Sequence, residues 1–445
     1  MARFRYKPLL PSWSVECLLM LTIPWGLYRL VDYFFSAGFL PLPFVFDTSD
    51  TFMDWFNPAY YAHNGLAYSE YISIYAPLSF VILEVLGESA CYNSSLYPKQ
   101  TRECDVIGIA AILIIFALCA ILAAIAFYKR DRKTFFYRSV AFGLGLPMLY
   151  ALERGNLIMI AFIFFIVLYG DLVRGRIAQA ITAGLMINMK SYLLFPVLGM
   201  AIKRDWRLLE IAGISTVGIY LVTMTIYGSG TPWELMNNLN VWFSAMSGIV
   251  WDQISYSTTY QPFLQFDTNF YPIRAFISDR TIEYITIFIK TEVLASRIIA
   301  FICIGFAWLY PKAISKERLA LFLLLQSFIS NNPGGYGFSL ILFLVFLERW
   351  SNPVVGTAIV MAYILSIPTD FVLVNAVQVE RTSWLSQRIV STVYGLSVGA
   401  LLRPMAVVII LWSLALDTLV TVHKLIRSER PLLRVSIPGA RASTV

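Results

Sequence analysis

The sequence predicts an all-α membrane protein with about twelve transmembrane helices. Of its 445 residues, 58% are apolar and only 14% are charged, whereas soluble domains carry about 25% charged residues. The mean hydropathy is +0.69, and long apolar runs recur along the chain. Lys and Arg cluster in short segments between these runs, which is the positive-inside pattern of membrane proteins. This pattern accounts for the net charge of +7 without a nucleic-acid partner.

The first apolar run, residues 13–35, follows the basic segment MARFRYK, so we expect a cytoplasmic N-terminus and a retained first span. The next basic cluster, YKRDRK, follows the apolar run 105–127. Both clusters are cytoplasmic only if residues 36–104 lie outside. Within that loop the apolar piece YAPLSFVILEVLG is too short to cross, and we expect it to lie at the membrane interface.

Two hairpins follow, because each has basic residues at both of its ends. Residues 138–176 should form two spans that turn at 153–156, and residues 176–207 should turn near 188–191. Each arm of the second hairpin has about 13 residues, or about 20 Å of helix, which is shorter than a bilayer core of about 30 Å. Its turn should therefore end in a water-filled recess open to the outside, and half-length helices of this kind mark substrate sites.

The remaining spans alternate with two outside loops and leave both termini in the cytoplasm. The outside loops are residues 228–283 and 373–402, and the second should contain an interfacial helix near WLSQRIVSTVYG. We divide the chain into an N-terminal catalytic membrane module, 1–230, and a C-terminal membrane module, 231–445, with no separate soluble domain. The expected later spans are 208–227, 285–310, 319–331, 337–348, 353–372 and 402–422.

This topology gathers unusual polar residues on the outside face. Ionisable groups at membrane depth are costly and rare, so they are candidates for function. The candidates are Asp47, Asp50, Asp54, Glu153, Arg154, Asn156, Asn188 and Lys190, with SNNPGGYG at 330–337 nearby.

Asp50 and Asp54 would share one face if they lay on a helix. Their mutual repulsion would make one carboxylate a better proton acceptor, which suits a general base. The alternative is a solvated loop whose aspartates cap helices. Two carboxylates are also a weak cage for a divalent ion, so we expect no metal and no other cofactor.

Lys190 lies between two apolar segments with no carboxylate close in sequence. A phosphate or pyrophosphate would neutralise it, and the alternative is a lysine that reaches the interface. Arg154 is a second candidate for phosphate, although an ion pair with neighbouring Glu153 is an alternative. Asn156 would otherwise cap the next helix, and NNPGGYG would otherwise be a plain turn.

The five cysteines fall into two groups. Cys17, Cys119 and Cys303 lie in apolar runs and are read as packing residues, whereas Cys91 and Cys104 lie in a polar loop where an oxidising compartment would allow them to pair. The two histidines are too far apart for a metal motif. No P-loop, nucleotide-binding glycine motif or HExxH is present in the sequence, which disfavours coupling to ATP.

The order of four motifs resembles a known family. An aspartate precedes aromatics in the first outside loop (DTFMDWFNPAYYA), and a Tyr-x-Pro-Leu element follows (YAPL). A Gly-Asn pair opens a span (ERGNLIMI), and a lysine-aromatic-proline hairpin ends before a basic loop (MKSYLLFP, then KRDWR). Over residues 15–230 this pattern resembles the C-type integral-membrane glycosyltransferases. Within them it is similar to the polyprenyl-phosphate-sugar-dependent group of glycosyltransferase family 87, which includes mycobacterial mannosyltransferases.

The resemblance implies a C-type glycosyltransferase fold with extracytoplasmic juxtamembrane helices. It implies that a hexose, mannose first, moves from a polyprenyl-phosphate donor to a lipid-linked or glycan acceptor during cell-envelope glycolipid synthesis. The site would face the periplasmic side of the inner (plasma) membrane. Its expected residues are Asp54 and then Asp50 as base; Lys190 and Arg154 on the donor phosphate; and Asp47, Tyr75, Glu153, Asn156, Asn188, Asn332 and Tyr336 on substrate, with Asn332 or Tyr336 in place of a later outside histidine.

Two other readings remain open from the sequence. A polysaccharide polymerase or ligase would use outside arginines, for which Arg381, Arg388 and Arg403 are candidates, and would leave Asp54 dispensable. A transporter or lipid flippase would share the buried charges and broken helices without bond chemistry.

Overall fold

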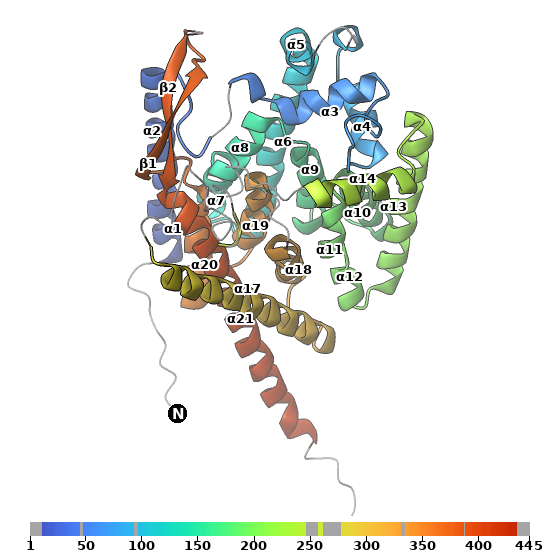
Figure 1. The fold of residues 1–445 in the computed structure, drawn as a ribbon. Coiled ribbons are helices and arrows are strands. Elements are labelled where there is room, and N and C mark those ends of the chain that lie inside the picture. Colours follow the sequence, from blue (N-terminus) through green and yellow to red (C-terminus); the bar gives the residue numbers. More distant parts are fainter. Residues whose placement is uncertain are drawn as a thin grey trace, which may run out of the picture.

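The computed structural model describes residues 11–44, 48–92, 97–245, 257–260, 277–330, 334–386 and 388–433. The fold is 75% helical with almost no sheet, as an all-α membrane protein should be. Figure 1 shows short helices, α3, α4 and α5, at one end of the molecule and longer helices running away from them. The structure does not confirm the twelve expected crossings, because several of the segments expected to cross form short or broken helices.

The N-terminal half contains the following elements: α1 (Ser12–Met20), α2 (Thr22–Ala37), η1 (Thr48–Asp50), α3 (Met53–His63), α4 (Pro77–Val85), η2 (Ser89–Cys91), α5 (Pro98–Cys104), α6 (Val106–Arg130), α7 (Phe135–Gly143), α8 (Leu146–Arg154), α9 (Ile158–Tyr169), α10 (Arg176–Met189), η3 (Ser191–Leu193), α11 (Leu194–Val197), α12 (Gly199–Ile202) and α13 (Trp206–Tyr227).

The C-terminal half continues with α14 (Pro232–Ala245), α17 (Asp279–Leu309), α18 (Lys316–Ser330), η5 (Gly335–Gly337), α19 (Phe338–Phe346), α20 (Pro353–Ser366), β1 (Val372–Thr382), β2 (Ile389–Ser397) and α21 (Val398–Leu433). The expected span 353–372 ends early, at Ser366. Pro368 explains this, because a residue that precedes proline is driven to an extended backbone, and Ile367 has ψ 121°.

Among the described residues, five helices are long and apolar enough to cross a membrane. They are Ser12–Ala37, Val106–Arg130, Phe135–Arg154, Trp206–Tyr227 and Val398–Ser428. Shorter apolar helices are Ile158–Tyr169, Ser191–Ile202, Gly335–Phe346 and Pro353–Ser366.

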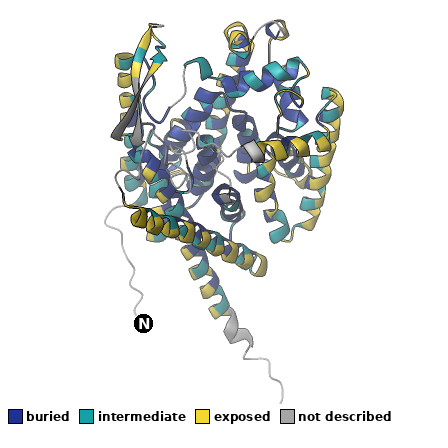
Figure 2. Cartoon of the chain, in the orientation of Figure 1, coloured by how far each residue is buried: buried dark blue, intermediate teal, exposed yellow. Residues whose placement is uncertain are grey.

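The short apolar helices form the centre of the molecule, and the long ones surround them. Helices α9 and α19 are buried on nearly every face, as expected for helices without a polar side. Phe162 and Phe165 of α9 contact Phe343 of α19, with ring centroids 5.7 and 6.0 Å apart. Figure 2 shows the buried centre and exposed residues along α13 and α17. Many of these exposed residues are large and apolar, which suits a surface that meets lipid.

Both sequence-predicted hairpins are present. At the second, Arg176 at the start of α10 lies 3.8 Å from Asp205 before α13, so the chain has returned to the end from which it started. At the first, Lys129 at the end of α6 donates to the carbonyl of Asp171 after α9, at 3.3 Å. The turns between the arms, at Glu153–Asn156 and at Lys190, therefore lie away from these basic ends.

The second outside loop differs from the expectation. The sequence predicts an interfacial helix near WLSQRIVSTVYG, but residues 372–382 and 389–397 form two antiparallel strands in which Thr382 pairs with Ile389. The interfacial-helix prediction was wrong because both segments are rich in Val, Ile and Thr, which favour strands. The turn is anchored to the first span, where the Trp384 amide donates to the Gly38 carbonyl at 2.9 Å. Figure 1 shows this hairpin beside α2.

A fully buried ion pair joins α1 to α7. Arg138 donates to both carboxylate oxygens of Glu16 at 2.7 Å, and the two side chains are 1% and 0% exposed. Tyr363 of α20 donates to the same carboxylate at 3.0 Å. Arg138 also donates to the carbonyls of Phe346 and Glu348. Every charge here is paired, so we assign the group a structural role.

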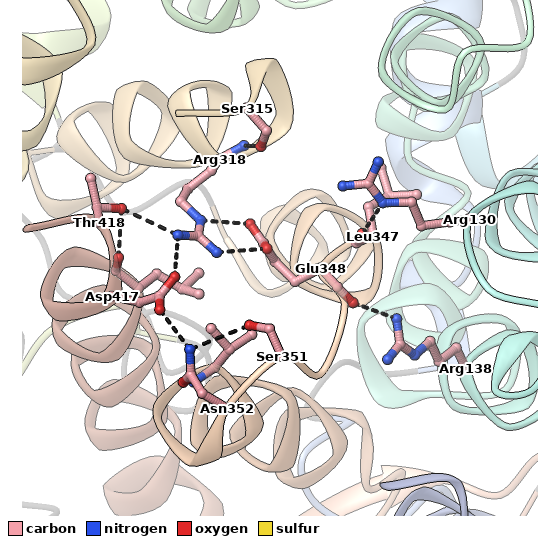
Figure 3. Close-up of polar contacts among 12 residues, drawn as sticks. Arg130, Arg138, Ser315, Arg318, Leu347, Glu348, Ser351, Asn352, Asp417 and Thr418 are labelled. Atoms are coloured by element: carbon pink, nitrogen blue, oxygen red, sulfur yellow. Dashed lines mark hydrogen bonds and ion pairs between the residues drawn. The ribbon is translucent and has the colours of Figure 1, made fainter. Parts of the chain in front are cut away.

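A second ion-pair group extends the first along the same end (Figure 3). Arg318 of α18 forms a two-pronged contact with the Glu348 carboxylate, at 2.8 and 2.7 Å, and reaches Asp417 of α21 at 2.6 Å. Asn352 donates to the other oxygen of Asp417 at 2.7 Å. The contacts hold α18, α20 and α21 together at the end opposite the polar outside loops.

Candidate functional site

Arg154 lies between Asp50 and Asp54, in the segment 48–54 that is called the aspartate loop from here on. Its Nη2 is 2.7 Å from Asp54 Oδ1, and its Nη1 bonds the Asp50 carboxylate and, at 3.2 Å, the Asp50 carbonyl. The Arg154 side chain is 9% exposed, whereas those of Asp50 and Asp54 are 34% and 25% exposed. The guanidinium is thus buried beneath two carboxylates that still reach solvent.

This arrangement revises the sequence-based picture of the pair. Asp50 ends η1 and Asp54 lies in the first turn of α3, so the two do not share a helical face. The cation between them removes the mutual repulsion that the spacing suggested. The ion pairs described for Arg154 are with the two aspartates.

Two left-handed residues bring the loops together. Phe52 has φ 63°, and its amide donates to the Glu153 carbonyl at 2.9 Å. Gly155, at the end of α8, also has φ 63°, and a Cβ there would lie 3.1 Å from the Phe52 Cα. Glycine alone meets both demands without strain. The Gly-Asn pair of the sequence therefore marks the place where α8 ends against the aspartate loop.

Asn156 contacts Asp54 and also bonds to the first residue of α9. Its Nδ2 donates to Asp54 Oδ2 at 2.6 Å, and its Oδ1 accepts the Ile158 amide at the start of α9 at 2.9 Å. Each carboxylate oxygen has two lone pairs. Asp54 therefore keeps acceptor capacity beyond its bonds to Arg154 and Asn156.

Glu153 lies beneath the aspartate loop. The Thr51 hydroxyl donates to its Oε1 at 3.4 Å, while Oε2 is buried and has no hydrogen-bond partner among the described residues. The side chain is 9% exposed. Glu153 therefore contacts the aspartate loop through its carbonyl, which accepts the Phe52 amide, and through its carboxylate, which accepts the Thr51 hydroxyl.

Lys190 follows the last residue of α10 and is surrounded by tyrosines. Its Nζ donates to the Tyr75 hydroxyl at 3.1 Å and lies 4.3 Å from the centroid of that ring and 5.8 Å from that of Tyr336. Aromatic faces attract a cation at such distances. Within the described part of the chain, no carboxylate lies within 4.0 Å of this buried ammonium.

The aspartate loop and Lys190 act on each other electrostatically. Lys190 and Tyr75 lie outside the five candidate spans. Burial lowers the pKa of Lys190 to about 8, and the Asp54 carboxylate opposes that shift. Burial also raises the pKa of Tyr75, with Asp54 adding to the rise and Arg154 opposing it. The Asp54 carboxylate thus favours the ammonium form of Lys190, which burial disfavours.

The other sequence candidates divide between the site and its surroundings. Tyr336, in η5, lies near Lys190, and its ring stacks on Tyr150 at 6.2 Å. Asn188 is directed elsewhere, because its amide donates to the Gly184 and Thr216 carbonyls at 2.9 and 3.0 Å. Asp47 and Asn332 lie outside the described residues.

The sequence analysis did not single out Tyr192 or Arg102. The Tyr192 hydroxyl, two residues after Lys190, is buried without a hydrogen-bond partner among the described residues. Its presence in the lysine-aromatic-proline motif was the available signal. Arg102 contacts the aspartate loop, as developed below, and nothing in its local sequence marks it.

Cys91 and Cys104, the pair considered from the sequence, are joined by a disulfide. The remaining cysteines are free, and Cys119 and Cys303 are buried. In the described ranges, no group of three or more His, Cys, Asp or Glu residues is placed to hold a metal ion.

Two other features lie away from the aspartates. Arg403, an arginine of the ligase reading, pairs with Asp370 at 2.6 Å, and both side chains are 5% exposed. A cavity of about 570 Å³ lies at the far end of α6, next to Lys129, Arg174 and Gln179. The aspartate loop lies at the other end of α6, where Arg102 before that helix contacts residues 48–51.

Fold and site together define an all-α protein whose apolar helices suit a membrane and in which Asp50, Asp54, Arg154 and Asn156 meet at one end. No family model, curated protein or solved structure matches the chain.

Proposed function

We propose that this protein is a membrane glycosyltransferase. It moves a hexose, mannose first, from a polyprenyl-phosphate donor to a lipid-linked or glycan acceptor, on the extracytoplasmic side of the inner (plasma) membrane. One observation carries the proposal: a partly exposed carboxylate, Asp54, is held in place by Arg154 and Asn156, and a buried ammonium, Lys190, contacts the Tyr75 hydroxyl.

In the proposed reaction, the acceptor hydroxyl oxygen attacks the anomeric carbon and its proton passes to Asp54. The bond from the anomeric carbon to the phosphate oxygen breaks, and polyprenyl phosphate leaves with the bonding electrons. A direct displacement of this kind inverts the anomeric centre. Asp50, on the other side of Arg154, is the second candidate for the base.

Lys190 is proposed to bind the donor phosphate. A buried ammonium that has a hydroxyl and two aromatic faces around it still requires an anion. A phosphate would supply that charge, and the cation would stabilise the leaving group as its negative charge increases. Tyr75 is placed to orient the same phosphate, since its hydroxyl already contacts Lys190.

Arg154 takes a different role in this proposal from the one that the sequence suggested. Its guanidinium bonds both aspartates, so it is better placed to orient the carboxylates than to hold phosphate. Glu153 and Asn156 support the same loop, and Tyr336 lies on the Lys190 side.

Two features support the extracytoplasmic orientation and the twelve-span topology. The Cys91–Cys104 disulfide belongs to the aspartate end, and disulfides persist in oxidising compartments. The basic clusters that end α6 and precede α13 belong to the other end. A lipid-phosphate donor is compatible with a site in this oxidising compartment. The proposed displacement involves no change of oxidation state, so it requires no redox cofactor.

The test is incubation of the purified protein with a panel of polyprenyl-phosphate sugars and a glycolipid acceptor, with detection of free polyprenyl phosphate and sugar product. The proposal expects both products in equal amounts from one donor. Turnover of pyrophosphate-linked saccharides alone would indicate a polymerase or ligase. Flux of an intact lipid-linked sugar across vesicles, without product, would indicate a transporter.

A further inference from the structure

Arg102, in the short helix α5, contacts the backbone of the aspartate loop. Its Nη1 lies 3.0 Å from the Thr48 carbonyl oxygen, 3.3 Å from that of Ser49 and 3.0 Å from that of Thr51. These three residues flank Asp50 on both sides. One guanidinium group therefore bonds three carbonyl oxygens of the turn that contains Asp50.

The turn that Arg102 contacts is short. It is a three-residue 3-10 helix that ends before the left-handed Phe52. Charged donors form stronger hydrogen bonds to carbonyls than neutral donors do. Burial lowers the pKa of Arg102, and the charges of Glu103 and Asp50 oppose that shift. The Glu103 contact is long, at 3.9 Å, and that carboxylate is 62% exposed, so it contributes little.

Helix α5 is itself anchored by the disulfide. Cys104, two residues after Arg102, is bonded to Cys91 at the end of η2. Next to it, Asp105 accepts the Tyr92 hydroxyl at 2.6 Å, the Glu88 amide at 3.2 Å and the Gly108 amide at 2.8 Å. The end of α5 is thus tied both covalently and by hydrogen bonds.

We propose that Arg102 is a positioning residue for Asp50 and Asp54, and that the Cys91–Cys104 disulfide keeps it in place. The disulfide holds α5, and Arg102 of α5 bonds the three carbonyls of the turn. That turn carries Asp50, which shares Arg154 with Asp54. The inference deepens the proposed function, since it concerns the loop that carries the proposed base.

The first test is hydrogen exchange of the full-length protein in detergent, without substrate. In Arg102→Gln, the amides of Phe52, Trp55 and Phe56 should exchange at least about 10-fold faster than in the wild type. Arg102→Lys keeps the charge and should restore part of the protection. Lys99→Gln removes an exposed charge from the same helix and is the matched control, which should exchange as the wild type does. Unchanged exchange in Arg102→Gln would overturn the proposal.

The second test concerns the disulfide. The variant Cys91→Ser/Cys104→Ser should show the same faster exchange in residues 52–56. Combining it with Arg102→Gln should add nothing further, because both changes remove one contact pathway. Additive effects in the combined variant, or wild-type exchange in the serine variant, would contradict the role of the disulfide.

The third test uses turnover. Arg102→Gln should lower kcat at least about 10-fold with the donor KM changed less than about 2-fold, because the base is misplaced and the phosphate site is not. A rise in donor KM with unchanged kcat would reject the positioning role. If the wild type transfers no sugar, the proposed function fails, while the exchange measurements still decide whether Arg102 orders the loop.

Discussion

Asp54 and Asn156 are joined by a 2.6 Å hydrogen bond although 102 residues separate them in the chain. Arg154, two residues before Asn156, bonds the other oxygen of the same carboxylate. The end of α8 thus fixes the orientation of a side chain on α3. The predictions below follow from this contact and from Lys190 nearby.

Replacing Asp54 by Asn should lower the transfer rate by about 10²–10⁴-fold, which is the usual contribution of a general base. The measurement is product formation at saturating donor and acceptor. Asp32→Asn changes an exposed aspartate of α2 and should leave the rate unaltered. A variant Asp54→Asn that turns over as the wild type does would remove Asp54 from the role of base, and the same measurement on Asp50→Asn would then decide between the two.

Replacing Arg154 by Gln should destabilise the protein, because it leaves two neighbouring carboxylates without their cation. Both aspartates are partly exposed, so we expect a loss of about 1–3 kcal/mol, less than for a fully buried pair. Thermal unfolding in detergent is the measurement. Adding Asp50→Asn to Arg154→Gln should recover part of the loss, and a double variant less stable than Arg154→Gln would argue against repulsion as the cause.

Lys190→Ala should raise the donor KM by about 10-fold or more, since a charged hydrogen bond to phosphate contributes about 1.5–3 kcal/mol. The acceptor KM should remain close to the wild-type value. Lys203→Ala, at the basic end of the same hairpin, is the comparison variant and should leave the donor KM as it is. An unchanged donor KM in Lys190→Ala would remove its proposed phosphate role.

The value of kcat/KM for the donor should fall as pH rises through about 8. Lys190 has its pKa lowered to about 8 by burial, so the free protein holds the ammonium below that pH and loses it above. Since kcat/KM reports the free enzyme, the alkaline limb should appear there. Lys190→Arg keeps its charge at higher pH and should lack that limb. A limb at the same pH in Lys190→Arg would assign it to another group.

Chelation with EDTA should leave the transfer rate within about 2-fold of the untreated protein, because the proposed leaving group is stabilised by Lys190 rather than by a metal ion. The rate after dialysis against EDTA is the measurement. Loss of activity that Mg²⁺ or Mn²⁺ restores would show that the aspartate loop works with a metal.

The positions of Lys and Arg along the sequence predicted the two helical hairpins, and with them that Asp50, Asp54, Arg154 and Asn156 lie at one end. Basic residues at both ends of a segment force the chain to return, and this rule needs no tertiary information. The positive-inside rule does not predict the ion-pair partners of Arg154. These partners depend on two residues with left-handed backbone, Phe52 and Gly155, which lie in loops distant in sequence.

Other features were missed for different reasons. The hairpin of β1 and β2 was missed because alternating Val and Thr near a membrane were read as an interfacial segment. Arg102 was missed because its partners are main-chain carbonyls, which leave no mark on side-chain patterns. Asn188 is the reverse case, since a polar residue at the turn proved to bond to α10 and α13.

The central claim is that Asp54 and Lys190 belong to one donor site, and footprinting of both residues tests it most directly. Asp54 is labelled with a carbodiimide and Lys190 with an amine reagent, each over a titration of the polyprenyl-phosphate sugar that turns over best. We predict that both residues become protected with the same half-saturating donor concentration. Protection of one residue alone, or at clearly different concentrations, would contradict the claim.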